Sequence, residues 1–156
     1  KRDQRLKSVQ IQFSLLAPDL NKQYQVRKIC IENNIDFFAY SPLSFGILCI
    51  DPDGDKKKEN SLIRNALFEK YKKPTYELRS CLKKIANQRS VSQAQVAINW
   101  CCYQGTIPLV GMRKKSQVID VSNVFKWNLN KNEFNMLQEV SNNCLKKMPN
   151  NPFSSL

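Results

Sequence analysis

The order of three segments near the start of the chain limits its fold more than any other feature. Alternating apolar and polar residues over Val9–Leu16 predict a strand. Apolar residues at helical spacing predict a helix over residues 23–32, and the apolar run at residues 36–40 predicts a second strand. A strand, a helix and a strand within about 30 residues form a βαβ unit with parallel strands and a right-handed crossover. The chain is therefore predicted to be an α/β protein with a parallel sheet.

The remainder of the chain continues with helices and one further strand. The pattern predicts helices over residues 61–71, 75–88, 92–103, 116–125 and 130–143, and a strand over residues 107–111. Ser92 with Gln95, and Asn130 with Glu133, have the spacing of capping boxes that start helices. The helix over residues 92–103 is apolar on nearly every side, so we expect it to be buried.

Two segments are expected to be less ordered than the rest. The loop over residues 51–60 is polar and charge-dense, and its three alternating aspartates invite comparison with a calcium loop. Lys56 and Leu62 stand where the EF-hand pattern requires Gly and Glu, so a mobile surface loop fits better than a metal site. The tail over residues 148–156 is rich in Pro, Asn and Ser, and we expect it to fray.

Composition and charge exclude several classes of function. With 42% hydrophobic and 24% charged residues, the 156-residue chain fits one soluble domain, and no apolar run suggests a membrane span. The net charge is +12, but the basic residues are scattered in twos and threes without a stripe of interleaved aromatics. A solvated surface is favoured over nucleic-acid binding. The chain has no histidine, which excludes a Ser-His-Asp triad, a Cys-His dyad and a His-ligated metal within it.

Cysteine usage and the start of the chain suggest an intracellular piece of a longer protein. No Cys-x-x-Cys pair occurs among the six cysteines, and several of them fall within apolar helical patterns. Buried, reduced thiols therefore fit better than disulfides or a zinc site, and we expect a cytoplasmic location. The chain lacks an initiator Met, so we expect it to be a cut piece from which any targeting signal is missing.

The end of the second predicted strand is suited to binding a ligand. Pro42 ends the strand because it has no N–H to donate, and the loop that follows contains hydroxyls, backbone amides and Gly46. Ligands of parallel α/β folds bind at the carboxyl ends of the strands. Taken singly, Tyr40 would more often be a core aromatic, and Arg113 a solvated residue at a helix start. The residues alone therefore predict a binding site but do not identify its ligand.

Four motifs, in one order, resemble the C-terminal half of an aldo-keto reductase. They are Gln10-x-x-Phe13-Ser14-Leu15-Leu16, Ala39-Tyr40-Ser41-Pro42-Leu43 with Gly46, Gln95-Val96-Ala97-Ile98-Asn99-Trp100, and Ile107-Pro108-x-x-Gly111-x-Arg113 with Gln117. The resemblance extends from Val9 to Asn143. It implies an α/β fold that forms the C-terminal part, the last three strands and their helices, of a (β/α)8 TIM barrel.

The resemblance also implies a binding surface for NADPH. Gln10 matches the amide that holds the nicotinamide carboxamide, and Tyr40 matches the aromatic that stacks on the nicotinamide ring. The family's pyrophosphate loop matches Ser41, Pro42, Leu43, Ser44 and Phe45. Its segment around the adenosine and the 2′-phosphate matches Gly111, Arg113, Gln117 and Asp120. Arg64 is a weaker candidate for a second phosphate contact, and Arg113 with the positive charge favours NADPH over NADH.

Some residues that the family uses are absent. Asp51 stands where the family often has Lys, and Val121 where Asn is common. The family's proton-donor Tyr, its partner Lys and Asp, and its usual His lie on the first four strands, outside this chain. The resemblance thus implies that the complete protein reduces aldehydes or ketones to alcohols. By itself the chain is expected to be inactive and to expose sheet edges that the missing N-terminal half would cover.

Two other functions agree with the same residues. The chain also resembles part of the NADPH-binding β subunits of voltage-gated potassium channels, which implies a sensing or regulatory role. A half-sized, non-catalytic scaffold is a third possibility. Turnover of generic aldehydes by the full-length protein would separate the reductase from the regulatory subunit. The sequence predicts neither the substrate nor the oligomeric state.

Overall fold

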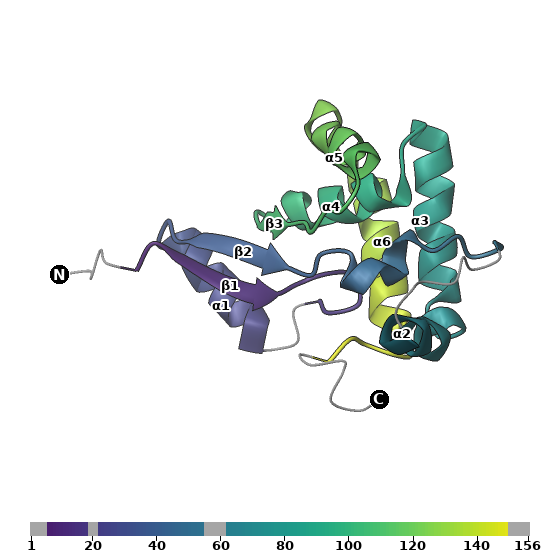
Figure 1. Cartoon of the computed structure of the whole chain (residues 1–156). Helices are drawn as coiled ribbons and strands as arrows, with labels where there is room; N and C mark the ends of the chain where they lie inside the picture. Colours follow the sequence, from purple (N-terminus) through teal and green to yellow (C-terminus); the bar gives the residue numbers. More distant parts are fainter. Residues whose placement is uncertain (1–5, 19–21, 55–61, 150–156) are drawn as a thin grey trace.

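The computed structural model describes residues 6–18, 22–54 and 62–149 (Figure 1). Its sheet has three strands in the order β1-β2-β3, and both neighbouring pairs are parallel. The strands are β1 (Ser8–Gln12), β2 (Asp36–Tyr40) and β3 (Ile107–Leu109). Helix α1 (Lys22–Glu32) forms the connection from β1 to β2. The predicted βαβ unit and the α/β class are therefore confirmed.

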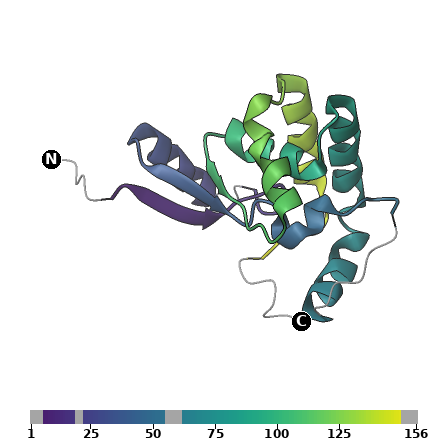
Figure 2. The ribbon, with the colours of Figure 1, turned by 45° about the horizontal axis from the view of Figure 1, so that its top comes forward.

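The remaining helices gather to one side of the strands. They are η1 (Ser44–Cys49), α2 (Leu62–Lys72), α3 (Tyr76–Arg89), α4 (Gln93–Tyr103), α5 (Lys115–Ser122), η2 (Val124–Lys126) and α6 (Lys131–Asn143). Figures 1 and 2 show β1, β2 and α1 extending away from a layer in which α3, α4 and α6 pack together. The loops that follow the strands therefore lie where the strands meet the helical layer.

The predicted helix over residues 116–125 is two helices in the structure. Helix α5 ends at Ser122, and a short 3-10 helix, η2, follows it. The side chain of Asn123 donates a hydrogen bond to the carbonyl of Ile119 at 2.9 Å, and so occupies an acceptor of the last turn of α5. An Asn side chain that bonds its own backbone competes with helix continuation. The apolar spacing continues through this break and therefore conceals it.

The first strand is shorter than its pattern predicts. It was expected over residues 9–16, but β1 ends at Gln12, and Ser14 then pairs its backbone with that of Ala17. The Ser14 hydroxyl accepts hydrogen bonds from the amides of Leu16 and Ala17 at 3.2 and 3.1 Å. Because the residues of this turn are buried, its sequence is as apolar as that of a buried strand, and the pattern does not show where the strand ends. The third strand likewise ends at Leu109 rather than at residue 111.

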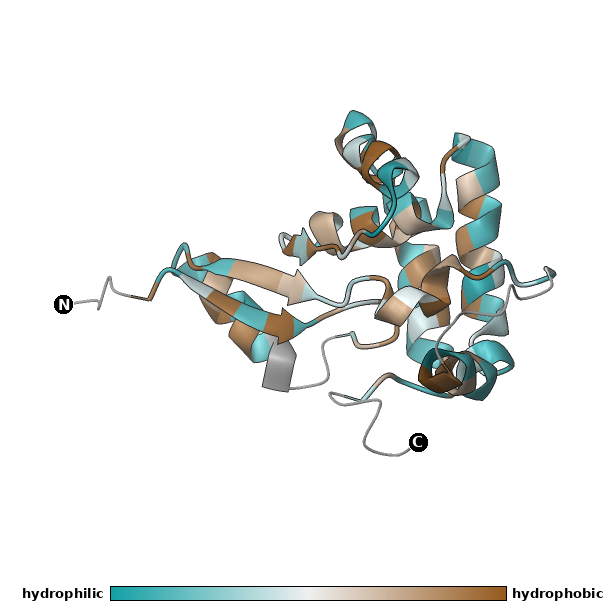
Figure 3. Ribbon diagram, viewed as in Figure 1, coloured by the Kyte–Doolittle hydropathy of each residue, from teal (hydrophilic) through white to brown (hydrophobic). Residues whose placement is uncertain are grey.

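The two faces of the sheet have different surroundings. Phe37 and Ala39 of β2 are buried in the core beneath the helices. Phe38, which alternates with them, faces the other side and pairs with Ile107 of β3. Ile107 and Leu109 are 42% and 38% exposed, and Figure 3 shows apolar residues along the strands. One face of the sheet is therefore apolar yet open, as it would be if part of the fold were absent.

Helix α4 is the centre of the helical layer. Its residues 95–101 are all buried, which confirms the prediction made from its apolar composition. Asn99 is a buried polar residue of this helix, and its amide donates to the carbonyls of Val124 and Trp127 at 3.2 and 2.9 Å. Its side-chain oxygen accepts from the amide of Leu129 at 3.1 Å. Asn99 therefore holds the connection between η2 and α6 against α4.

The two predicted helix caps differ in completeness. Asn130 and Glu133 form a full capping box, in which each side chain accepts a hydrogen bond from the other's backbone amide, at 2.9 and 2.8 Å. At α4 the Ser92 hydroxyl accepts from the amide of Gln95 at 3.1 Å, as expected. The Gln95 side chain does not reach back, because it bonds Asp120 and Trp127 instead.

The ends of two predicted flexible segments can be described in part. Asp51 and Asp53 both bond the ammonium of Lys83, at 2.7 and 3.1 Å. The rest of the predicted mobile loop, residues 55–60, lies outside the described residues. Met148 is buried, and its amide donates to the carbonyl of Leu16, so fraying does not begin at that residue. Residues 150–156 lie outside the described residues.

All six cysteines are free thiols. Cys30, Cys81 and Cys101 are buried as expected, whereas Cys49 is exposed. Burial raises the pKa of the Cys81 and Cys101 thiols, so both are protonated at neutral pH. Within the described ranges, no helix combines the length and the apolar character needed to cross a membrane.

The ion pair between Arg89 and Glu133 gives a prediction about acid stability. Two Arg89 nitrogens donate to the two Glu133 oxygens at 2.8 and 2.9 Å. This hydrogen bond lowers the pKa of the Glu133 carboxyl below its ordinary value of 4.5. Its stabilisation is therefore present above the unfolded-state pKa and is lost as the pH falls through the folded-state pKa. We expect Glu133→Gln to lower the free energy of unfolding by about 2 kcal/mol at neutral pH.

The comparison should be made by urea unfolding at pH about 7 and about 3, because the difference should shrink once the carboxyl is protonated. Glutamine retains an oxygen that can accept the amide of Asn130, so the substitution tests the charge rather than the cap. Glu139→Gln, on an exposed position of the same helix, is the matched control. A difference that stays constant from neutral to acidic pH would contradict the assignment.

Candidate functional site

The predicted site residues follow the carboxyl ends of the strands. Tyr40, the last residue of β2, pairs with Gln12 of β1 on one side and with Leu109 of β3 on the other. The amide of Phe13 donates to the carbonyl of Tyr40 at 3.2 Å, so the chain leaves β1 beside the end of β2. The segments after the strands therefore begin at one edge of the sheet, where α/β folds bind their ligands.

The loop after β2 has an unusual backbone conformation. Ser41, Ser44 and Phe45 all have positive φ angles, of 54°, 48° and 59°, and Gly46 follows at 94°. A left-handed conformation costs a non-glycine residue about 1 kcal/mol or more. Two backbone hydrogen bonds of 2.9 Å hold this shape, from Ser44 to Ser41 and from Gly46 to Leu43. Strain of this kind, at the end of a parallel strand, supports a functional role for residues 41–46.

A buried hydrogen bond fixes this loop to the turn after β1. The Oγ atoms of Ser14 and Ser44 are 2.8 Å apart, and both residues are fully buried. The Ser14 oxygen already accepts two backbone amides, so its own hydrogen is the one donated to Ser44. Ser14 belongs to the first motif, but sequence reasoning gave it no role. The Ser14-x-x-Ala17 spacing of a hydroxyl-capped turn was the available signal.

Arg64 holds the other end of the same loop. It lies in α2, and its guanidinium donates to the carbonyl of Phe45 at 3.0 Å. A Cβ atom at Gly46 would lie 3.3 Å from Arg64 Nη2, and the φ of 94° disfavours any other residue there. Gly46 is thus required by both its conformation and its neighbour. The structure gives Arg64 a role in shaping the loop, and its predicted phosphate contact stays a prediction.

The two residues predicted to contact a nicotinamide share the open face of the sheet. Gln10 pairs with Phe38, and Gln12 with Tyr40, so all four side chains point away from the helical layer. Gln10 is exposed and Tyr40 is half-buried. Gln12 is buried, and both polar atoms of its amide lack a partner among the described residues. Sequence reasoning missed this residue. A buried amide without a partner is costly, which again indicates that part of the fold is absent.

The pyrophosphate-loop residues differ in what they expose. Pro42 and Ser44 are buried, whereas Ser41, Leu43 and Phe45 are half-buried. The Ser44 hydroxyl is engaged with Ser14, as described above. A ligand above this loop would therefore meet its backbone and the side chains of Ser41, Leu43 and Phe45.

The start of α5 is open and positively charged. Gly111 and Arg113 are both exposed, and a Cβ atom on Gly111 would have no atom within 4 Å. The Gln117 oxygen accepts the amides of Arg113 and Lys114 at 2.8 and 3.0 Å, which caps the helix from within. Among the described residues no carboxylate pairs with Arg113. Its guanidinium therefore lies beside the positive end of the helix dipole.

Asp120 has partners within the protein. Its carboxylate accepts hydrogen bonds from the Ser92 hydroxyl at 2.6 Å and from the Gln95 amide at 2.7 Å. Gln95 in turn accepts from the indole of Trp127 at 3.1 Å. These contacts attach α5 to the beginning of α4. The structure thus gives Asp120 a structural role, and a cofactor contact for it stays a prediction.

The predicted residues fall into two neighbouring groups. Tyr40 and the loop over residues 41–45 lie at the end of β2, and Gln10 lies two residues before the end of β1. Gly111 follows β3 by two residues, so the segment that leads to Arg113 starts beside Tyr40. The carboxyl edge of the sheet is therefore the origin of both groups. Together, the open parallel sheet and its helices have the arrangement of part of a (β/α)8 barrel, in which the carboxyl ends of the strands are the candidate ligand site.

Comparisons with known proteins identify the family. The aldo/keto reductase family model matches residues 1–142, so the chain belongs to the aldo/keto reductase family. Pyridoxal reductase from Arabidopsis thaliana, a chloroplastic protein, is 33% identical over 148 residues. That match covers 95% of this chain and 40% of the relative. The chain thus spans less than half the length of this curated relative.

Solved structures confirm the predicted fold. Glycerol dehydrogenase from Gluconobacter oxydans superposes with a TM-score of 0.71 at 23% identity. The match covers 93% of this chain and 45% of that one. A variant of Gox0644 in complex with NADPH superposes with a TM-score of 0.59 at 18% identity, covering 86% of this chain and 38% of the other. The chain is therefore part of a (β/α)8 barrel, as predicted.

Proposed function

We propose that this chain is the NADPH-binding part of an aldo-keto reductase that reduces aldehydes or ketones to alcohols. The observation that supports this most directly is the open, cationic start of α5. Arg113 is exposed there, its backbone amide is capped by Gln117, and no described carboxylate pairs with its guanidinium. A planar guanidinium beside a helix N-terminus suits a phosphate monoester, such as the 2′-phosphate that separates NADPH from NADH.

The other predicted residues fit the cofactor to different degrees. Gly111 leaves space for close approach, since a Cβ atom there would have no neighbour within 4 Å. Tyr40 and Gln10 lie on the open face of the sheet, which suits a flat ring and its carboxamide. Asp120 fits least, because its carboxylate is occupied and would repel phosphates. We propose that it acts by holding α5 in place.

In this proposal the chain binds and orients NADPH, and NADPH when bound supplies the hydride for the carbonyl carbon. Tyr40 would stack on the nicotinamide ring, and Gln10 would hydrogen-bond its carboxamide. The strained loop over residues 41–46 presents a fixed backbone to the pyrophosphate. The resemblance implies that the acid that protonates the carbonyl oxygen is a Tyr on the first four strands of the barrel, outside this chain, and that Tyr40 stacks instead. The chain alone is therefore expected to be inactive.

The rest of the barrel is the partner that this proposal requires. The open face with Ile107 and Leu109 and the unpaired edges of β1 and β3 would be covered by it. The substrate pocket would form between the two parts, with a small-molecule carbonyl compound as substrate. Since a relative is a pyridoxal reductase, pyridoxal is the first aldehyde to test. Free thiols suit a reducing compartment such as the cytoplasm.

NADPH fluorescence titration of the chain, alone and with the N-terminal part of the longer protein supplied as a second polypeptide, tests the proposal. We expect binding and aldehyde turnover only in the complemented form. Binding without turnover of pyridoxal or generic aldehydes would favour the regulatory subunit instead. Sedimentation should be run in parallel, so that failure to assemble is recognised. An assembled complex that does not bind NADPH would contradict the cofactor assignment.

A further inference from the structure

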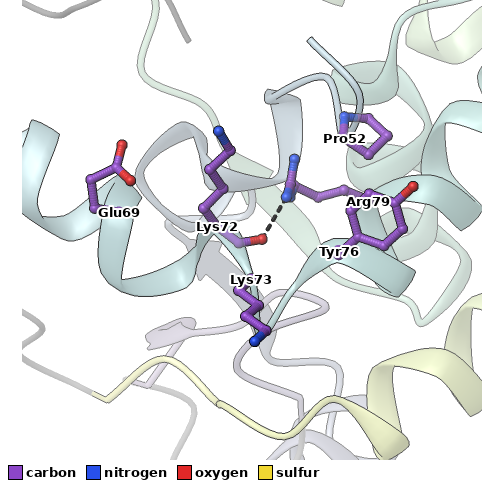
Figure 4. A pocket seen from close by; sticks show the side chains of 6 residues that line it. All are labelled: Pro52, Glu69, Lys72, Lys73, Tyr76 and Arg79. Atoms are coloured by element: carbon purple, nitrogen blue, oxygen red, sulfur yellow. Dashed lines mark hydrogen bonds between the residues drawn. The ribbon is translucent and has the colours of Figure 1, made fainter. Parts of the chain in front are cut away.

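A pocket of about 300 Å³ lies away from the carboxyl edge of the sheet (Figure 4). It is lined by Pro52, Glu69, Lys72, Lys73, Tyr76 and Arg79. These residues come from the turn after η1 and from the junction between α2 and α3. Figure 1 shows α2 and α5 on opposite sides of the helical layer, so this pocket is distinct from the region of Arg113.

Arg79 is a fixed, buried cation at this pocket. Its side chain is fully buried, and its guanidinium donates to the Thr75 hydroxyl at 3.1 Å. It also donates to the carbonyls of Ile50, Asp51 and Lys72, at 3.3, 3.2 and 2.6 Å. All four acceptors are neutral oxygens, so the guanidinium is held in place without a carboxylate bonded to it. One of its five N–H groups is left without an acceptor among these contacts.

The other charged residues leave the pocket positive. Lys72 and Lys73 are exposed, and within the described ranges neither belongs to an ion pair. Glu69 is the single carboxylate among the lining residues, so cations exceed carboxylates by two. Asp51 and Asp53 lie close by and share the single ammonium of Lys83, at 2.7 and 3.1 Å, and Asp53 also accepts from the Tyr76 hydroxyl at 3.0 Å, so this group takes one charge from the excess.

The start of α3 adds to the positive potential. This helix of 14 residues begins at Tyr76, which lines the pocket. Its cap residue, Thr75, makes no side-chain cap bond, because the hydroxyl donates to the carbonyl of Tyr71 at 2.7 Å and accepts from Arg79. No cap side chain bonds the first amides of the helix, but Glu77 in the first turn carries a negative charge, so the partial positive charge of the N-terminus is reduced and not left unopposed.

We propose that this pocket binds a small phosphorylated molecule through its phosphate monoester. Among the lining residues cations exceed carboxylates by two, and this local excess favours a phosphate dianion over a carboxylate, which has a single charge. The exposed, flexible ammonium groups of Lys72 and Lys73 provide donors, and the buried guanidinium of Arg79 adds a fixed positive charge. The Tyr76 ring, in a residue 43% exposed, and Pro52 provide an apolar wall for the organic part of the ligand. The inference is independent of NADPH binding, since it concerns different residues.

Titration of the chain with phenyl phosphate, followed by amide NMR shifts, tests this inference. We expect shifts concentrated at residues 72–79, weakened by added salt. The double substitution Lys72→Gln with Lys73→Gln should lower the affinity at least about tenfold, without touching buried Arg79. The matched control is Lys126→Gln with Lys131→Gln, which removes the same charge from exposed positions near the far end of α3.

Several results would overturn the proposal. They are equal affinity in the two double variants, shifts confined to residues 111–120, or binding of benzoate as tight as that of phenyl phosphate. Inorganic phosphate that binds as tightly as phenyl phosphate would overturn the role of Tyr76 and Pro52. Much tighter binding of a short single-stranded oligonucleotide would replace the small molecule by a nucleic acid. The proposal would be supported if phenyl phosphate binding were lost in the double variant of Lys72 and Lys73 but not in the control variant, and if benzoate bound only weakly.

Discussion

Replacing Trp100 with alanine is expected to lower the free energy of unfolding by about 4 kcal/mol. Trp100 is fully buried in the middle of α4, and its ring stacks on those of Phe13 and Phe134, with centroids 5.1 and 6.5 Å apart. These rings belong to the turn after β1 and to α6, so the indole joins the sheet to the helical layer. Its removal would leave a cavity that three separate elements cannot close together. Urea unfolding followed by circular dichroism measures the loss.

Trp100→Phe is the matched control for this substitution. It keeps an aromatic ring between Phe13 and Phe134, and it removes an indole N–H that is buried without an acceptor among the described residues. The loss of volume destabilises the fold, whereas removal of the unsatisfied donor stabilises it. The free energy of unfolding should therefore fall by less than about 1.5 kcal/mol. If Trp100→Ala lowered the free energy of unfolding no more than Trp100→Phe does, the stacked rings would not be what joins the sheet to the helices.

The extent to which the fold follows from sequence differs between its elements. The βαβ unit and the buried helix α4 follow from local periodicity, because both bury residues in a pattern set by their own backbone. The end of β1 does not, since the buried turn from Phe13 to Ala17 is as apolar as a strand. Likewise, the end of α5 depends on the side chain of Asn123, which apolar spacing does not record.

The sequence supplied the candidate residues of the site but not their contacts, and the assignment of these residues to a cofactor stays a prediction. The resemblance supplied Gln10, Tyr40 and Arg113 as single positions, and the structure places them near one edge of the sheet. It could not supply the bond between Ser14 and Ser44, which are 30 residues apart and meet only in the folded chain. Nor could it show that the carboxylate of Asp120 is already bonded. Side chains that act on other side chains leave no pattern in a single sequence.

Three features of the structure indicate that part of the barrel is missing. An apolar sheet face is open, strand edges are unpaired, and a buried amide at Gln12 lacks a partner within the described residues. All three lie on or beside the sheet, and the chain covers less than half of its barrel relatives. The residues proposed to bind the cofactor at α5, in contrast, all belong to this chain. A substitution there can therefore test cofactor binding separately from assembly.

Arg113→Ala, in the complemented protein, is expected to weaken NADPH binding about 100-fold and to leave NADH binding unchanged. The two cofactors differ only by the 2′-phosphate, which is the group assigned to the Arg113 guanidinium. The substitution should not disturb the fold, because Arg113 is exposed and its backbone amide still bonds Gln117. Fluorescence titration with each cofactor, on the same preparation, gives the ratio of the two affinities.

Two further variants make this result interpretable. Arg113→Lys keeps the charge but loses the forked geometry, so it should retain only part of the NADPH preference. Lys131→Ala removes an exposed charge from the start of α6 and should change neither affinity, which controls for the general positive field. Equal losses for NADPH and NADH in Arg113→Ala would show that Arg113 supports the binding surface as a whole. The preference for NADPH would then need another cation, and Arg64, already beside the pyrophosphate loop, would be the next residue to substitute.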